Sequence, residues 1–213
     1  MIWAVKEIFY TLQGEGARTG TAAVFCRFSG CNLWTGREED RAGAVCRFCD
    51  TDFAGTDGPG GGRYDDPAAL ASAARRAWDG PWPLSGRPLL VSTGGEPLLQ
   101  LDVRLVGAFH AAGFEVAVET NGTRPVPPGV DWVTVSPKAG AGLAVTEGDE
   151  LKLVFPQEGL DPASFSALRF RHFFLQPMDG PDRGQSTRLA ASYCLAHPEW
   201  RLSLQMHKLA GLP

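Results

Sequence analysis

Apolar segments of strand length alternate along the chain with apolar residues at helical spacing. The strand-like segments, bounded in several places by glycine, predict strands at residues 2–10, 21–28, 88–93, 114–122, 130–135, 150–155, 171–175 and 201–205. Asp66 and Pro67 are typical of a helix start, because Asp caps the first turn and Pro suits it. Helical spacing predicts helices between Pro67 and Gly80, between Leu98 and Gly113, and from Thr187 to Ala196.

Strands that alternate with helices are typical of an α/β domain built on a parallel sheet. About six or seven parallel strands can be placed, fewer than the eight of a closed barrel, and not every strand is followed by a clear helix. The pattern therefore predicts an incomplete TIM-like barrel of parallel strands. A chain of 213 residues is long enough for one sizeable domain and too short for two ordinary ones, so we expect one domain over residues 1–213.

Polar residues gather where the predicted strands end. In parallel α/β architectures the C-terminal edge of the sheet is where ligands bind, so one shared pocket would explain these residues together. The polar strand ends are Cys31, Thr93 to Glu96, Glu119 to Asn121, Ser136 to Lys138, and Gln176 to Asp179.

Three of the five cysteines lie close together and indicate a metal site. Fourteen residues separate Cys31 from Cys46, and two separate Cys46 from Cys49. If Cys26 joins them, four thiolates can hold a structural zinc ion. If it does not, three thiolates remain, one short of the usual set for zinc or an iron–sulfur cluster, and one coordination position stays open. The spacing alone leaves both readings open.

Cys26 lies in a predicted strand in which alternate side chains share one face. Val24, Cys26 and Phe28 fall on one face of this strand, and Phe25 and Arg27 fall on the other. Free cysteine usually packs in the core, so we expect Cys26 to do the same.

Composition narrows the function classes. A hydrophobic content of 44% and a charged content of 21% are typical of a soluble globular protein. The net charge of −4 argues against a general nucleic-acid binder, because phosphate contacts need a basic surface. The sequence has no apolar run of membrane-spanning length and no signal-peptide order at its start, so no membrane partner is expected. Five clustered cysteines do not suggest a disulfide framework, and a reducing cytoplasm fits best.

The motifs together resemble the radical S-adenosylmethionine superfamily. The features are the three-cysteine loop after an early strand, the Gly94-Gly95-Glu96-Pro97 turn and the Glu119-Thr120-Asn121-Gly122 strand end. Within that superfamily, the sequence resembles the 7-carboxy-7-deazaguanine synthase family through Gln13-Gly14-Glu15-Gly16, Cys49-Asp50-Thr51 and Gln205-Met206-His207-Lys208. The resemblance runs nearly end to end, and it implies the partial-barrel fold of the superfamily.

One departure from the superfamily concerns the cysteine loop. Most members separate the first two cysteines by three residues, whereas fourteen separate them here. We therefore interpret residues 32–45 as an insertion inside the loop. Closing a longer loop costs little, because the entropy grows only with the logarithm of its length, so the ligand set can survive.

The resemblance implies the cofactors and their contacts. Cys31, Cys46 and Cys49 would hold a 4Fe–4S cluster whose fourth iron binds S-adenosylmethionine, and Thr51 would bind Mg²⁺. Without the resemblance, we would interpret Thr51 as the start of a turn, and the Gly-Gly-Glu-Pro segment as a turn between a strand and a helix. The expected S-adenosylmethionine contacts are Phe48, Cys49, Asp50, Gly94, Gly95, Glu96, Ser136, Pro137, Lys138, Gln176, Pro177, Met178 and Asp179.

The resemblance also implies the reaction. The substrate would be 6-carboxy-5,6,7,8-tetrahydropterin, converted by radical ring contraction and loss of ammonia to 7-carboxy-7-deazaguanine. An electron donor such as flavodoxin or ferredoxin and a homodimer are expected. The expected substrate contacts are Leu12, Gln13, Gly14, Glu15, Arg27, Thr93, Glu119, Asn121, His207 and Pro213.

Two other classes of function stay open on the sequence. An activating subunit of a glycyl-radical enzyme would share the cysteine loop and the Gly-Gly-Glu turn but act on a protein partner. A structural zinc-binding module would use all four clustered cysteines and catalyse nothing.

Overall fold

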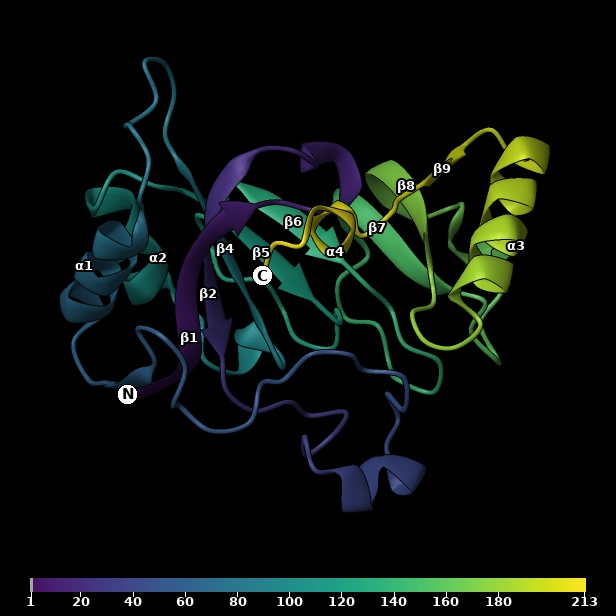
Figure 1. The fold of residues 1–213 in the computed structure, drawn as a ribbon, viewed down its shortest axis with the longest axis horizontal. Coiled ribbons are helices and arrows are strands. Elements are labelled where there is room, and N and C mark those ends of the chain that lie inside the picture. Colours follow the sequence, from purple (N-terminus) through teal and green to yellow (C-terminus); the bar gives the residue numbers. More distant parts are fainter. Residues whose placement is uncertain (1) are drawn as a thin grey trace.

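Nine strands form one sheet over residues 2–213, which the computed structural model describes (Figure 1). They are β1 (Trp3–Leu12), β2 (Ala22–Phe28), β3 (Gly62–Tyr64), β4 (Leu89–Gly94), β5 (Glu115–Thr120), β6 (Trp132–Val135), β7 (Glu147–Phe155), β8 (Arg169–Pro177) and β9 (Trp200–Leu202). The order across the sheet is β3-β1-β2-β4-β5-β6-β7-β8-β9. The strands from β2 to β9 in this order are parallel, whereas β1 is antiparallel to both β2 and β3. The predicted parallel α/β sheet is confirmed, and the antiparallel pair at one edge was not predicted.

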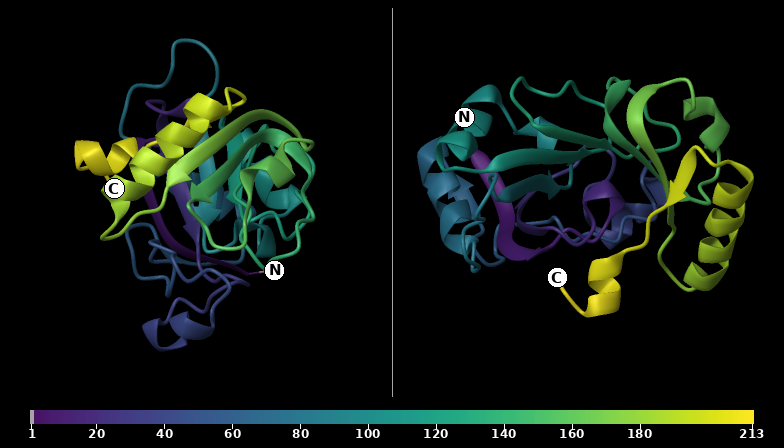
Figure 2. Two further views of the ribbon diagram at one scale, coloured as in Figure 1. Left: turned by 90° about the vertical axis from the view of Figure 1, so that its right-hand side faces the viewer. Right: turned by 90° about the horizontal axis from the view of Figure 1, so that it is seen from above.

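The main helices pack on one side of a curved sheet. Figure 1 shows α1 and α2 beside β1 and β2, and α3 at the opposite end beside β8 and β9; Figure 2 shows the curvature. The α-helices are α1 (Pro67–Ala77), α2 (Val103–Ala111), α3 (Arg183–Ala196) and α4 (Met206–Ala210). Short 3₁₀ helices are η1 (Gly16–Arg18), η2 (Glu38–Gly43), η3 (Pro97–Leu99) and η4 (Pro162–Phe165). Within residues 2–213 the structure contains no helix long and apolar enough to cross a membrane.

Two hydrophobic clusters join the helices to the outer face of the sheet. In the first, Leu70 of α1 and Phe109 of α2 pack with Val24 and Phe28 of β2. In the second, Ala190 of α3 packs with side chains of β6 to β9, including Leu151, Leu153 and Leu175. Burying each large apolar side chain contributes roughly 1.5–3 kcal/mol. Because alternate residues point to opposite faces, this packing leaves the other set of side chains on the inner face.

The predicted start of the first helix is confirmed. Asp66 is the N-cap of α1, and its carboxylate accepts hydrogen bonds from the backbone N–H groups of Ala68 and Ala69 at 3.1 and 3.2 Å. Replacing such a cap by alanine typically costs about 1 kcal/mol.

The prediction of one continuous helix from Leu98 was wrong. The chain makes η3, breaks, and starts α2 only at Val103, where the Asp102 carboxylate accepts from Leu105 N at 2.9 Å. The break is held by Gln100, whose side chain bonds to the backbone of Ala4 and Ser29. The Asp102 cap starts a new helix, and the Gln100 side chain is bound to β1 and to the residue after β2. Together they prevent the single helix that the spacing of apolar residues predicts.

Candidate active site

The C-terminal ends of the parallel strands surround a cavity of about 460 Å³. Its wall consists of inner-face side chains of β1, β2 and β4 to β8, together with the cysteine loop and the last residues of the chain. This volume is within the range of small-molecule sites. The shared pocket predicted from the polar strand ends is confirmed.

Most of the residues predicted to contact cluster, cofactor or substrate line this cavity. They are Leu12, Gln13, Glu15, Arg27, Cys31, Cys46, Phe48, Cys49, Asp50, Thr51, Thr93, Gly94, Gly95, Glu119, Asn121, Ser136, Lys138, Gln176, Pro177, Asp179, His207 and Pro213. Four others lie outside the lining: Gly14, Glu96, Pro137 and Met178. The individual roles of all these residues stay predictions.

Gly14 lies behind the cavity wall and allows two segments to approach closely. Its carbonyl oxygen accepts from Met206 N at 2.9 Å, so the turn after β1 meets the start of α4. A Cβ at position 14 would lie 2.8 Å from the backbone nitrogen of His207 and would overlap its ring. Glycine at this position therefore permits His207 to reach the cavity.

Glu96 is fully buried, and protein donors surround its carboxylate. The oxygens accept from Leu98 N at 2.9 Å, Thr120 Oγ1 at 2.7 Å and Asn121 N at 2.8 Å. Burial raises the pKa of Glu96 despite these hydrogen bonds. In this structure Glu96 ties the turn after β4 to the end of β5, and its contact with an S-adenosylmethionine ammonium stays a prediction.

Three cysteines line the cavity and one does not. Cys31 follows β2, and Cys46 and Cys49 come from the loop beyond it. Cys26 is fully buried in the core with Val24 and Phe28, as predicted, and burial raises the pKa of its thiol to about 12. The closed four-cysteine zinc site therefore lacks its fourth ligand.

The three cavity thiols fit a cluster rather than a single ion. The neighbouring Cys46 thiol lowers the pKa of Cys49 to about 6, which favours the thiolate, the form that binds metal. The buried Lys138 ammonium favours the same charge. Among the described residues no three His, Cys, Asp or Glu side chains converge on one metal ion. A cluster does not need such convergence, because each thiolate binds a different iron.

The segment 32–45 folds against the cysteine loop as a small unit of its own. It includes η2, the short blue helix at the bottom of Figure 1. Trp34 packs edge-on against the buried Phe53 at 5.5 Å, and the Arg41 guanidinium lies 4.0 Å from the Trp34 ring. Arg41 Nη1 also donates to the carbonyl oxygens of Arg47 and Cys49 at 2.8 and 3.1 Å. This segment therefore contacts the backbone that carries Cys49.

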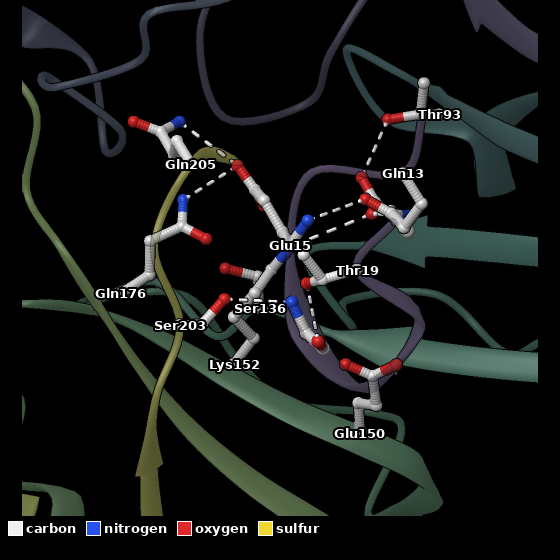
Figure 3. A network of polar contacts seen from close by, with 12 residues as sticks. Gln13, Glu15, Thr19, Thr93, Ser136, Glu150, Lys152, Gln176, Ser203 and Gln205 are labelled. Atoms are coloured by element: carbon white, nitrogen blue, oxygen red, sulfur yellow. Dashed lines mark hydrogen bonds and ion pairs between the residues drawn. The ribbon is translucent and has the colours of Figure 1, made fainter. Parts of the chain in front are cut away.

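Glu15 is the centre of a buried polar network (Figure 3). Its carboxylate accepts from Lys152, from Gln176 Nε2 at 3.1 Å and from Gln205 Nε2 at 3.1 Å. Burial alone would raise the pKa of Glu15, but the Lys152 ammonium outweighs burial and lowers that pKa. Glu15 thus carries a negative charge inside the cavity.

A second carboxylate beside this network belongs to Glu119 of β5. Its oxygens accept from Gln13 Nε2 at 3.1 Å and from Thr93 Oγ1 at 3.4 Å, and Lys152 Nζ lies 3.7 Å away. Thr93 is paired in register with Arg27, whose Nε donates to Glu7 at 2.8 Å. The adjacent strands thus place donors and acceptors for a polar ligand on one wall.

The last residues of the chain close over the cavity. Lys208 Nζ donates to Asp50 and Asp179 at 2.6 Å each, and Thr11 Oγ1 donates to the Pro213 carbonyl at 3.2 Å. Figure 1 shows α4 in front of the central strands. The C-terminal segment therefore fastens to the cysteine loop, to the end of β8 and to β1.

Sequence reasoning missed five charged or amide side chains that line the cavity: Glu7, Asp52, Lys152, Gln205 and Lys208. For Lys152 a signal was present. Glu150 and Lys152 alternate with leucines in a predicted central strand. The central strands of a parallel sheet that is covered on both faces usually carry apolar residues throughout, so charged residues there indicate a polar inner face. For Gln205 and Lys208 the sequence gives no sign of where the chain end folds back.

Known proteins match this chain over nearly its full length in sequence and in structure. No family model matches the chain. The chain is 62% identical over 213 residues to the 7-carboxy-7-deazaguanine synthase of Bordetella pertussis and 61% identical over 216 residues to that of Caulobacter vibrioides, each alignment covering 100% of both proteins. A solved structure of QueE from Escherichia coli matches with a TM-score of 0.69 and 28% identity, covering 97% of this chain and 95% of that one. The chain belongs to the 7-carboxy-7-deazaguanine synthase family.

Proposed function

We propose that this protein converts 6-carboxy-5,6,7,8-tetrahydropterin to 7-carboxy-7-deazaguanine with loss of ammonia, as a radical S-adenosylmethionine carbon–nitrogen lyase of queuosine (deazapurine) biosynthesis. The observation that carries the proposal is the full-length agreement with curated relatives of that name, in a chain whose three clustered cysteines line one cavity. A glycyl-radical activase is not favoured, because the relatives that match end to end are named as synthases. A zinc module is not favoured, because Cys26 is packed in the core.

Cys31, Cys46 and Cys49 would hold the 4Fe–4S cluster. Residues from the other strand ends, among them Gly95, Ser136 and Lys138, would bind S-adenosylmethionine. When bound, these groups supply the one-electron chemistry that removes a hydrogen atom from the substrate. The position of the three cysteines on a cavity of about 460 Å³ supports this assignment.

The opposite wall would bind and orient the pterin. The carboxylates of Glu15 and Glu119 can accept hydrogen bonds from ring N–H and amino groups. The Nε–H of Arg27 donates to Glu7. The two terminal nitrogens of the guanidinium would then donate to the substrate carboxylate. The C-terminal segment would cover the ligand and exclude water from it.

We also propose that the curved sheet is an incomplete TIM-like barrel and that residues 1–213 form one radical S-adenosylmethionine domain with an insertion at residues 32–45. Support for the barrel comes from the uninterrupted parallel order from β2 to β9. Support for one domain comes from the hydrogen bond between Met206 N and the Gly14 carbonyl, which joins the two ends of the chain.

The expected partners are an electron donor such as flavodoxin or ferredoxin and a second copy of the chain in a homodimer. We propose the cytoplasm as the compartment. All five cysteines are free thiols, and a reducing compartment keeps such thiols available for a cluster.

The decisive test is an anaerobic assay with the reconstituted protein, the carboxypterin, S-adenosylmethionine and a reductant. We expect 7-carboxy-7-deazaguanine and ammonia in equal amounts. Cleavage of S-adenosylmethionine with no deazaguanine would contradict the synthase assignment and favour an activase. A colourless protein that takes up zinc in place of iron would exclude both enzymes.

We propose that Thr51 ligates Mg²⁺, since this ion takes few protein ligands and keeps several waters or substrate oxygens. Thr51→Ala should raise the Mg²⁺ concentration for half-maximal turnover by about tenfold, the effect of losing roughly 1.4 kcal/mol of binding free energy. Cleavage of S-adenosylmethionine should continue. Thr187→Ala, on the distant helix α3, is the control, and an unchanged Mg²⁺ response in Thr51→Ala would remove this residue from the site.

We propose that the insertion braces the cysteine loop through Arg41. Arg41→Met removes two charge-assisted hydrogen bonds to the loop backbone, so Cys49 should react faster with an alkylating reagent in the cluster-free protein. Arg37 lies in the same segment, but its side chain is 73% exposed and reaches only Glu39 at 3.7 Å. Arg37→Met should therefore leave the alkylation rate unchanged, and equal rates in both variants would contradict a brace.

A further inference from the structure

Strand β7 places two charged side chains inside the protein that the proposed function has not used. Glu150 and Lys152 share the inner face with Val154, and they are only 3% and 6% exposed. Charged residues are almost never this buried unless they are paired. The strand thus carries a buried lysine at the floor of the ligand cavity.

Lys152 connects two carboxylates that come from distant parts of the chain. Its ammonium donates to Glu15, in the turn after β1 (Figure 3). The same nitrogen lies 3.7 Å from an oxygen of Glu119 on β5. Gln176 and Gln205 complete the donors to Glu15, and both are neutral. Lys152 is therefore the cation that these two carboxylates share.

The charges around Lys152 are unequal in number. Burial alone would lower the pKa of Lys152, but Glu119, Glu15 and Glu150 outweigh burial and raise that pKa. Conversely, burial raises the pKa of Glu150, which accepts from Trp132 Nε1 at 2.7 Å. Glu15 and Glu150 thus depend on this one ammonium, and without it burial would favour their protonated forms.

We propose that Lys152 is a positioning residue for the pterin: its ammonium fixes the Glu15 and Glu119 carboxylates in the orientation in which they accept hydrogen bonds from the substrate. The inference rests on the proposed function and deepens it by naming the group that organises substrate binding. A carboxylate that has taken a proton loses acceptor capacity and presents an O–H to the N–H edge of the pterin. Lys152 therefore acts on the substrate through Glu15 and Glu119.

The test compares wild type with Lys152→Met over pH 6.5 to 8.5. Without the ammonium, burial raises the pKa of Glu15, which favours its protonated form most at the acid end of this range. We therefore expect the KM for the carboxypterin to increase by about tenfold at pH 6.5 and to fall toward the wild-type KM as the pH rises to 8.5. The kcat should change much less. A purely structural defect would not be repaired by higher pH.

Two further variants test whether the change in KM is specific to Lys152 and whether it acts through Glu15. Arg169→Met removes an exposed cation of β8 that pairs with Glu147 of β7, and it should behave as wild type. The double variant Lys152→Met/Glu15→Gln removes the proposed titrating group, so its KM should be high at every pH. The other charged groups around the pair, Glu119, Glu150, His207 and Lys138, are unchanged in it. Recovery at high pH in the double variant would exclude Glu15 as the group through which Lys152 acts.

A second measurement does not depend on turnover. A ligand that binds the folded protein raises its thermal unfolding midpoint. The carboxypterin should raise the midpoint of wild type at both pH values, but that of Lys152→Met only at pH 8.5. Equal shifts for both proteins at pH 6.5 would overturn the inference. Binding without any ring contraction by wild type would instead overturn the proposed function alone. If the single variant does not fold, the double variant, which lacks one buried charge of each sign, is compared with wild type instead, and a pterin-induced shift equal to that of wild type would overturn the inference.

Discussion

Cys46→Ala, and likewise Cys31→Ala and Cys49→Ala, should retain almost no iron after anaerobic reconstitution, against about four iron atoms per chain for wild type. Each replacement leaves two thiolates on the cavity, too few to hold the cluster. The measurement is iron and acid-labile sulfide per chain, together with the visible absorbance of the cluster. Production of 7-carboxy-7-deazaguanine should be lost with the iron.

The matched control is Cys26→Ala, which removes a thiol of the preceding strand β2 that faces the core. Cys26 is fully buried with Val24 and Phe28, so the variant should lose about 1 kcal/mol of stability through a small cavity and keep its full iron content. Loss of iron from this protein would bring the four-cysteine zinc reading back. Full iron in any of the other three variants would remove that cysteine from the ligand set.

Gly95→Ala should disable the site although position 95 supplies no ligand to the cluster. A Cβ at position 95 would overlap the carbonyl oxygen of Gly30 and lie 3.0 Å from the Cβ of Cys31. Hydrogen bonds hold the neighbouring backbone in place, because Gly95 N donates to Phe28 O at 3.1 Å and Glu96 N donates to Gly30 O at 2.9 Å. Forcing a methyl group into such a contact costs roughly 1–3 kcal/mol and displaces Cys31. We expect lower unfolding free energy and less than half of the wild-type iron.

The control for this change is Gly107→Ala in α2. A Cβ at position 107 meets nothing within 4 Å, and alanine is favoured over glycine inside a helix by about 0.8–1 kcal/mol. The two Gly→Ala changes should therefore shift the denaturant midpoint in opposite directions. A Gly95→Ala protein with native stability and iron content would show that the turn can move away from Cys31.

Local patterns predicted much of the fold. The parallel strands were predicted because apolar segments bounded by glycine have no other low-energy arrangement when helices separate them. Cys26 was predicted correctly from side-chain alternation alone. Strand β1 was predicted, but its antiparallel direction and the whole of β3 were not, because pairing across the sheet depends on contacts between residues far apart in sequence. The helix near Leu98 was wrong for the same reason, since Gln100 is held by Ala4 and Ser29.

Some features of the candidate site could likewise be predicted from the sequence, and others could not. The polar strand ends all reach one edge by topology, so the cavity followed from the order of the elements. Glu96 shows the limit: its position after Gly95 suggested a ligand contact, but its carboxylate is enclosed by Thr120 and Asn121. Lys208 shows another limit, because only the folded chain reveals that it spans Asp50 and Asp179.

The two faces of the sheet have separate tasks, and this has a consequence for engineering. Helices α1, α2 and α3 and the two apolar clusters that they join lie on the convex side, whereas the ionisable groups of the pocket lie on the concave side with a small apolar cluster of Ala23, Leu89, Val91 and Ala117. Changes more than 7–10 Å apart with no common partner usually add in free energy. A thermostabilised parent carrying helix-side substitutions such as Gly107→Ala should therefore tolerate replacements in the pocket that would unfold the natural sequence. The concave wall of such a parent becomes open to redesign for other heterocycles.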